Sequence, residues 1–220
     1  MSFDLAALSA NWLAFAKGFA TTLLICILAL PVGFAAGTGL AFIRLYGPRP
    51  VQAVAVAYVE LVRNIPFLIQ VFLLFFALPF FGVRLDATVA GALALTCYAV
   101  AYFAEIVRGA IATIAAGQTE AARALGLRTV AVFRLILLPQ TRSYIVPAAG
   151  STTLTLIKES SILSVIAVRE LTYTSQDVIG RTFAPVEVFT LVAVLYWVLT
   201  AAVARMTAAL ERPRPSQPNS

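Results

Sequence analysis

The stretch EAARALGLRTVAVFRLILLP, residues 120–139, stands out from a chain that is otherwise strongly apolar. Arg123, Arg128 and Arg134 follow one another too closely for this stretch to cross a lipid bilayer, because each charged side chain at bilayer depth costs several kcal/mol. Its alanines favour a helix, and Gly126 stands where a glycine commonly ends one. We therefore expect a helical segment at the membrane surface.

The stretch divides into two expected helices that meet at Gly126. Thr119 can cap the first helix, and Glu120 suits its first turn because a carboxylate is favourable near a helix N-terminus. The second helix is expected to end at Pro139. Its apolar stripe consists of Val130, Phe133, Ile136 and Leu137.

Composition places the whole chain among membrane proteins. Of its 220 residues, 61% are hydrophobic and 12% are charged, with a mean hydropathy of +0.92. Soluble domains carry about 25% charged residues. The net charge of +6 does not point to nucleic acid, because the basic residues border apolar runs. The absence of histidine removes the commonest metal ligand and general base, and Cys26 and Cys97 lie in apolar runs as small hydrophobes.

Five apolar runs are long enough to cross a bilayer. They are expected to be helices, because a segment in lipid must satisfy its backbone hydrogen bonds within itself. The expected spans are residues 16–44, 56–82, 87–110, 143–168 and 186–208 of a single transmembrane domain, residues 1–220. Residues 117–140 form the loop between the third and fourth spans. The first span is not expected to be a cleaved signal peptide, because only Asp4 and Lys17 carry charge before a very long apolar run.

The arginines predict the orientation, because basic residues gather on the cytoplasmic side. With the N-terminus outside, Lys17, Arg84, Arg169 and Arg181 lie outside, and the C-terminus lies inside. The cytoplasmic side or its interface then holds Arg44, Arg49, Arg63, Arg108, Arg123, Arg128, Arg134, Arg142, Arg205, Arg212 and Arg214.

Two local patterns predict how the spans pack. Gly33, Gly37 and Ala41 recur every four residues, which permits close helix contact either within one chain or between copies. Pro66 can start or kink the second span.

The loop resembles a known motif. Residues 120–122 (Glu-Ala-Ala), Gly126 and residues 136–139 (Ile-Leu-Leu-Pro) are spaced as in the EAA loop of ABC importer permeases. Three further segments resemble the polar amino acid subfamily, which includes histidine, glutamine and glutamate permeases. They are YVELVRNIP at residues 58–66, AEIVRG at 104–109 with Gly117-Gln118, and KESSILSVI at 158–166 with Glu170-Leu171.

The resemblance implies the type I ABC importer permease fold, with five transmembrane helices and a cytoplasmic two-helix coupling loop. The chain would be the transmembrane subunit of an ATP-driven amino acid importer in the bacterial inner membrane. Its partners would be a pair of ABC ATPase subunits, a second permease copy or paralogue, and a periplasmic or extracellular substrate-binding protein. The residues that couple it to the ATPase would be Glu120, Ala121, Ala122, Arg123, Gly126 and Pro139.

ATP chemistry is expected in the partner rather than in this chain. A phosphate-binding loop needs a lysine that follows a glycine, and neither Lys17 nor Lys158 does. No cofactor is therefore expected in this chain. The resemblance implies that ATP and Mg²⁺ are bound by the ATPase.

Charged and hydroxyl residues within the spans are candidates for the substrate path: Arg63, Glu105, Lys158, Glu159, Ser160 and Ser161. Lys158 or Arg63 could receive the carboxylate of an amino acid, and Glu159 or Glu105 its ammonium. The alternative is that these groups lock helices together. That alternative is favoured for the pairs Glu60–Arg63 and Glu105–Arg108, which have i,i+3 spacing.

Departures from the family pattern fall near this path. The family usually has Asp-Thr where Glu159-Ser160 stand, Gly-Thr where Asn64-Ile65 stand, and often Asn near Thr152 or Thr153. The identity of the carried amino acid therefore stays open.

Two other classes of function compete with the importer subunit. A secondary transporter or channel is disfavoured because five spans show no evident inverted repeat. An intramembrane enzyme cannot use histidine, and Asp4, Asp86 and Asp177 show no catalytic pairing, which leaves only a Ser-Lys dyad with Lys158.

Overall fold

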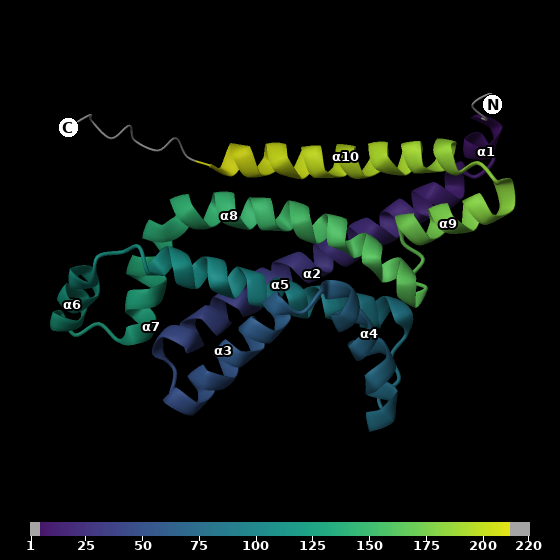
Figure 1. The fold of residues 1–220 in the computed structure, drawn as a ribbon. Helices are drawn as coiled ribbons and strands as arrows, with labels where there is room; N and C mark the ends of the chain where they lie inside the picture. The colour runs from purple at the N-terminus through teal and green to yellow at the C-terminus, as the bar shows by residue number, and fades with distance from the viewer. Residues whose placement is uncertain (1–4, 212–220) are drawn as a thin grey trace.

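The computed structural model describes residues 5–211, and every regular element in this part of the chain is helical (Figure 1). Asp4, Arg212 and Arg214 lie outside the described residues. The first half contains α1 (Leu5–Ser9), α2 (Trp12–Tyr46), α3 (Arg49–Asn64), α4 (Phe67–Ala77), the 3₁₀ helix η1 (Leu78–Phe81) and α5 (Ala87–Ile111). The second half contains α6 (Ala116–Ala124), α7 (Thr129–Ala131), the π-helical turn η2 (Val132–Leu137), α8 (Leu138–Glu159), the 3₁₀ helix η3 (Ser160–Ile166), α9 (Leu171–Thr182) and α10 (Pro185–Leu210).

Three helices of the described chain, α2, α5 and α10, are each long and apolar enough to cross a membrane. They correspond to the expected first, third and fifth spans. Two bent pairs raise the number to five when each counts as one span. The first pair is α3 with α4 and η1, bent by 113°, and the second is the helix 129–166 with α9, bent by 50°.

The expected second span, residues 56–82, is not one straight helix, because the chain breaks between Asn64 and Phe67. Pro66 disfavours the helical conformation at the preceding residue, and Ile65 is extended, with φ −98° and ψ 133°. Pro66 also has no N–H to donate to the carbonyl of Val62. The side chain of Gln70 donates instead to the carbonyls of Val62 and Ile65, both at 2.7 Å. The break therefore leaves neither carbonyl unpaired, as a membrane interior requires.

The centre of the fold is a close contact between α2 and α5. A Cβ added at Gly33 would lie 2.6 Å from the Cβ of Ala99, and one at Gly37 would lie 2.8 Å from the carbonyl oxygen of Val100. Ala41 is also fully buried. The small residues of the first span thus pack within the chain, which decides between the two alternatives predicted for them.

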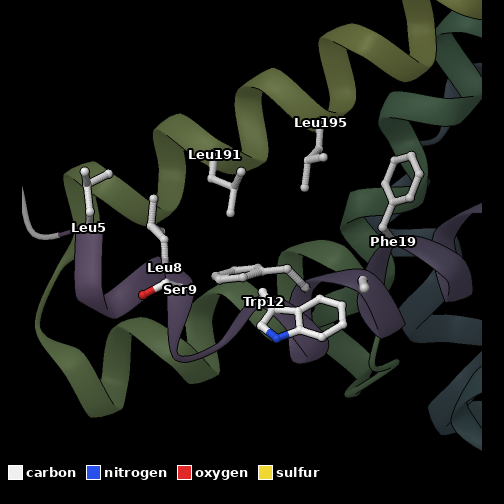
Figure 2. A pocket seen from close by; sticks show the side chains of 9 residues that line it. Leu5, Leu8, Ser9, Trp12, Phe19, Leu191 and Leu195 are labelled. Carbon is white, nitrogen blue, oxygen red and sulfur yellow. The ribbon is translucent and has the colours of Figure 1, made fainter.

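The remaining helices surround this pair. In Figure 1, α10 runs along α8, and a Cβ added at Gly150 of α8 would clash with the side chain of Thr207 of α10. The short helix α1 contacts the start of α10. Between α1, α2 and α10 lies an apolar groove of about 600 Å³, lined by leucines and by Trp12, whose side chain is largely exposed (Figure 2). α6 and α7 lie at one end of the molecule, and α1 and α9 at the other (Figure 1).

Candidate functional site

The first candidate site is the loop that contains α6. This helix begins at Ala116, because Ala115 already has the extended conformation that precedes a helix, with φ −58° and ψ 131°. Thr119 therefore lies inside the helix, and the prediction that it caps the N-terminus is wrong. Glu120 is correspondingly beyond the first turn, on the exposed surface.

The C-terminus of α6 confirms the prediction for Gly126. Gly126 has φ +79°, a left-handed conformation that glycine adopts without strain. Its N–H donates to the carbonyl of Arg123 at 2.9 Å, and the N–H of Leu127 donates to the carbonyl of Ala122 at 3.2 Å. These two bonds form a Schellman motif, which satisfies the last carbonyls and stops the helix abruptly.

Pro139 does not end the second helix, contrary to the prediction. The chain from Thr129 continues through the π-helical turn η2 into α8, which begins at Leu138. A proline removes one backbone donor, and a π-turn is one of the few ways in which a helix absorbs such a defect. Thr141 also donates its hydroxyl to the carbonyls of Leu137 and Leu138, at 3.1 and 3.0 Å. The part of the loop that starts at Thr129 is therefore continuous with α8.

α6 has one buried residue and a broad exposed surface. Ala122 is 2% exposed and belongs to a buried apolar cluster with Val107 of α5 and with Phe133 and Leu137 of η2. The exposed surface comprises Glu120, Ala121, Arg123, Ala124 and Gly126. The side chains of Gln118 and Gln140 bond each other at 2.9 Å and join the start of α6 to the start of α8. Small side chains on a helix that is anchored through Ala122 suit insertion into a cleft of another protein.

The second candidate site is a line of polar side chains along α5. Tyr98, Tyr102 and Glu105 have i, i+4 and i+7 spacing, which places them on one face of the helix. The Tyr98 hydroxyl donates to that of Tyr102 at 3.0 Å, and the Arg63 guanidinium lies 5.7 Å from the centre of the Tyr102 ring. Glu159, the last residue of α8, is half-buried.

Glu105 gathers three arginines at the end of this line. Its carboxylate accepts from Arg44 at 2.6 Å and from Arg108 at 2.5 Å, and lies 3.9 Å from Arg63. The Arg44 side chain is 10% exposed, whereas that of Arg63 is 43% exposed. The predicted Glu105–Arg108 pair is present. No Glu60–Arg63 ion pair forms among residues 5–211, because Arg63 turns toward α5 instead.

The segment from Lys158 to Ser161 lies where α8 tightens into η3, not in the middle of a regular helix as expected. Lys158 is exposed. Ser160 is buried and donates to the carbonyl of Ile157, and Ser161 donates to the carbonyl of Lys158, both at 2.7 Å. The two hydroxyls thus serve the tightened turn. Of the six predicted path residues, the structure brings Arg63 and Glu105 into direct contact.

Sequence reasoning gave no role to Tyr98, Tyr102 or Glu170. Glu170 is fully buried, caps α9 by accepting from the N–H groups of Thr172 and Tyr173, and accepts a hydrogen bond from Tyr196 of α10 at 3.0 Å. A carboxylate two and three residues before its donors is the local signal that could have identified this cap. The tyrosines could have been found from their spacing relative to Glu105.

Comparisons with known proteins agree over nearly the whole chain. Residues 29–214 match the family described as "Binding-protein-dependent transport system inner membrane component". The chain is 40% identical over 190 residues to the probable glutamine ABC transporter permease protein GlnM of Bacillus subtilis (strain 168), which covers 86% of this chain and 88% of that protein. It is 34% identical over 214 residues to the glutamine transport system permease protein GlnP of Escherichia coli (strain K12), with 96% and 98% covered.

Two solved structures share the fold. One is described as the crystal structure of an amino acid ABC transporter with histidines, and its matching chain has a TM-score of 0.87, 32% identity and coverage of 97% of this chain and 100% of that chain. The other shows inward-facing conformations of the MetNI methionine ABC transporter, with a TM-score of 0.74, 23% identity and coverage of 92% and 99%. The second likeness bears on the fold alone.

Proposed function

The chain belongs to the family of binding-protein-dependent transport system inner membrane components, and on this basis we propose that it carries amino acids as the transmembrane subunit of an ATP-driven importer. It is a transport component and not an enzyme. The observation that carries the proposed substrate class is the likeness to amino acid permeases from one end of the chain to the other.

The family implies an ATPase partner, and α6 is the surface proposed to receive it. In this proposal the exposed side of α6 sits in a groove of the ATPase, which binds ATP and Mg²⁺. Ala122 and the cluster around Val107 then pass a displacement of α6 to the last turns of α5. The Schellman motif at Gly126 supports this role, because a helix end with satisfied carbonyls moves as a unit.

The polar line along α5 is proposed as part of the amino acid path. A zwitterion needs a donor for its carboxylate and an acceptor for its ammonium. Arg63 is half-exposed and its ion pair with Glu105 is long, so it is the available donor, and Glu159 at the end of α8 is the proposed acceptor. Glu105 is engaged by Arg44 and Arg108, and its proposed role is to hold these arginines in place.

The proposed orientation places α6 in the cytoplasm and the N-terminus outside. The end with α1 and α9 then faces the substrate-binding protein that the family implies (Figure 1). A second permease, identical or paralogous, completes the path in this proposal.

Reconstitution tests the proposal. The chain is placed in proteoliposomes with its ATPase and binding protein, and uptake of labelled glutamine, arginine and histidine is measured. We expect ATP-dependent uptake that requires all components. The matched control is an ATPase variant that binds ATP but does not hydrolyse it, and uptake that persists with this variant would contradict the importer proposal in favour of a secondary transporter or channel.

A further inference from the structure

A small polar cavity lies at the end of the molecule opposite α6, between the start of α2 and α9. Its volume is about 280 Å³, and its charged lining residues are Lys17, Arg169 and Asp177. The polar line along α5 contributes none of the lining residues, so the two features are separate.

Close contact of two helices closes one side of this cavity. A Cβ added at Gly18 would lie 2.6 Å from the hydroxyl of Thr174 and 3.1 Å from the carbonyl oxygen of Glu170. Glu170 also occupies the first N–H groups of α9. The N-terminus of α9 is therefore not available to a ligand, and the charge in the cavity comes from side chains.

The charges have both signs. Neither Lys17 nor Arg169 forms an ion pair with any carboxylate in the described part of the chain. Asp177 binds Arg181 through Oδ2 at 2.7 Å, and its side chain is 55% exposed, which leaves Oδ1 open to another donor. Two cations and one carboxylate thus surround a hollow of molecular size.

We propose that this cavity is a binding site for a free zwitterionic α-amino acid, which it holds before the substrate reaches the path along α5. Lys17 and Arg169 receive the carboxylate, and Asp177 receives the ammonium. The identity of the ligand rests on the proposed substrate class. The volume supports a single small molecule, since it lies just below the range of about 300–1,000 Å³ usual for ligand pockets.

Protection of an introduced cysteine tests this assignment. The full chain is purified in lipid nanodiscs with Cys26→Ala and Cys97→Ala, and Ala14→Cys places a thiol in the cavity lining. The rate of reaction with a maleimide is measured with and without glutamine, arginine or histidine. The control is Gly180→Cys, an exposed position on α9 outside the cavity with open space around it.

We expect free amino acids to slow labelling at Ala14→Cys and not at Gly180→Cys. Arg169→Gln should raise the concentration needed for half-protection about tenfold, because one charge-assisted hydrogen bond is lost, and Arg169→Lys should restore part of it. Asp177→Asn should weaken protection similarly. Arg84→Gln, which removes an exposed cation outside the cavity, and Arg63→Gln and Glu159→Gln, in the proposed path, should leave it unchanged.

Three results would overturn the assignment. The first is equal labelling with and without amino acid. The second is equal protection by N-acetylglutamine, which has no ammonium and would indicate a general anion site. The third is protection only when the soluble binding protein is present, which would make the cavity a protein-docking surface. A chain that imports amino acids in proteoliposomes but shows no protection disproves this inference alone, whereas absent uptake of every amino acid disproves the substrate class.

Discussion

At the scale of single residues, Glu105 forms more ion pairs than any other carboxylate among residues 5–211. It neutralises part of the charge of three arginines from α2, α3 and α5. Arg44 depends on it most, because its side chain is nine-tenths buried and its Nε has no hydrogen-bond partner. A buried charge without a counter-charge is costly, so Glu105 is expected to hold α2, α3 and α5 together.

This interpretation predicts that loss of the Glu105 charge lowers the free energy of unfolding more than loss of the Arg63 charge. Glu105→Gln should destabilise the protein by about 3 kcal/mol, because it leaves Arg44 buried without a counter-charge. Arg63→Gln should cost less than about 1 kcal/mol, since Arg63 is partly exposed and its ion pair is long. Thermal unfolding in detergent measures both, and equal stability of the two variants would show that Glu105 does not serve as this anchor.

Arg63 offers a functional contrast to this structural effect. If Arg63 receives the substrate carboxylate, Arg63→Gln should lower uptake in proteoliposomes about tenfold or more while unfolding stays nearly unchanged. Arg63→Lys, which keeps the charge, is the control and should retain more uptake. Full uptake by Arg63→Gln would remove this residue from the path.

At the scale of helices, the contact between α2 and α5 offers a matched pair of glycines. Gly37→Ala should destabilise the protein by about 1–3 kcal/mol, because the new Cβ would press on the backbone of Val100 and Ala104. Gly39→Ala on the same helix meets nothing within 4 Å and should be neutral or slightly stabilising. The melting temperatures of the two variants are compared, and similar values would mean that the helices separate easily.

The end of α6 is the second element that can be tested. Gly126→Val should reduce uptake and co-purification of the ATPase while membrane insertion stays intact, because valine is strained at φ +79°. Gly126→Asn should be milder, since asparagine tolerates this conformation. Gly117→Ala, in open space on the same helix, is the control. Normal uptake by Gly126→Val would argue against a coupling role for this helix end.

The accuracy of the sequence predictions differed between elements for physical reasons. The end of α6 was predictable because a glycine stop is a local signal, complete within a few residues. The start of α6 was not, because Thr119 is an acceptable cap in isolation, whereas the path of the chain after α5 makes Ala115 the last non-helical residue before the helix. Pro139 and Pro66 look alike in sequence, yet the helix continues past Pro139 through a π-turn, whereas it breaks at Pro66. Tertiary contacts decide such outcomes.

At the scale of the whole molecule, the sequence predicted the fold class and the three straight spans because long apolar runs leave few alternatives in lipid. The polar line was only partly predictable. Arg63 and Glu105 are separated by a helix break whose angle the sequence does not reveal, and the tyrosines between them lie in an otherwise apolar run.

The proposed orientation yields a prediction for the two ends of the molecule. In the Cys26→Ala and Cys97→Ala background, Gly180→Cys should react with a membrane-impermeant maleimide in intact cells. Gly117→Cys on α6 should react only after the cells are permeabilised. Both positions are exposed and have open space around them, so the side of the membrane on which each lies decides whether it reacts. The reverse pattern would contradict the orientation with the N-terminus outside.

The corner between α3 and α4 has a mechanical consequence. Because the Gln70 amide bonds both carbonyls at the break, we expect α3 and α4 to move together as one rigid unit. A rotation of α3 near its contact with α5 should therefore displace the end of η1, where Phe80 and Phe81 are largely exposed, by a greater distance. A small motion of α3 would in this way become a large motion of η1.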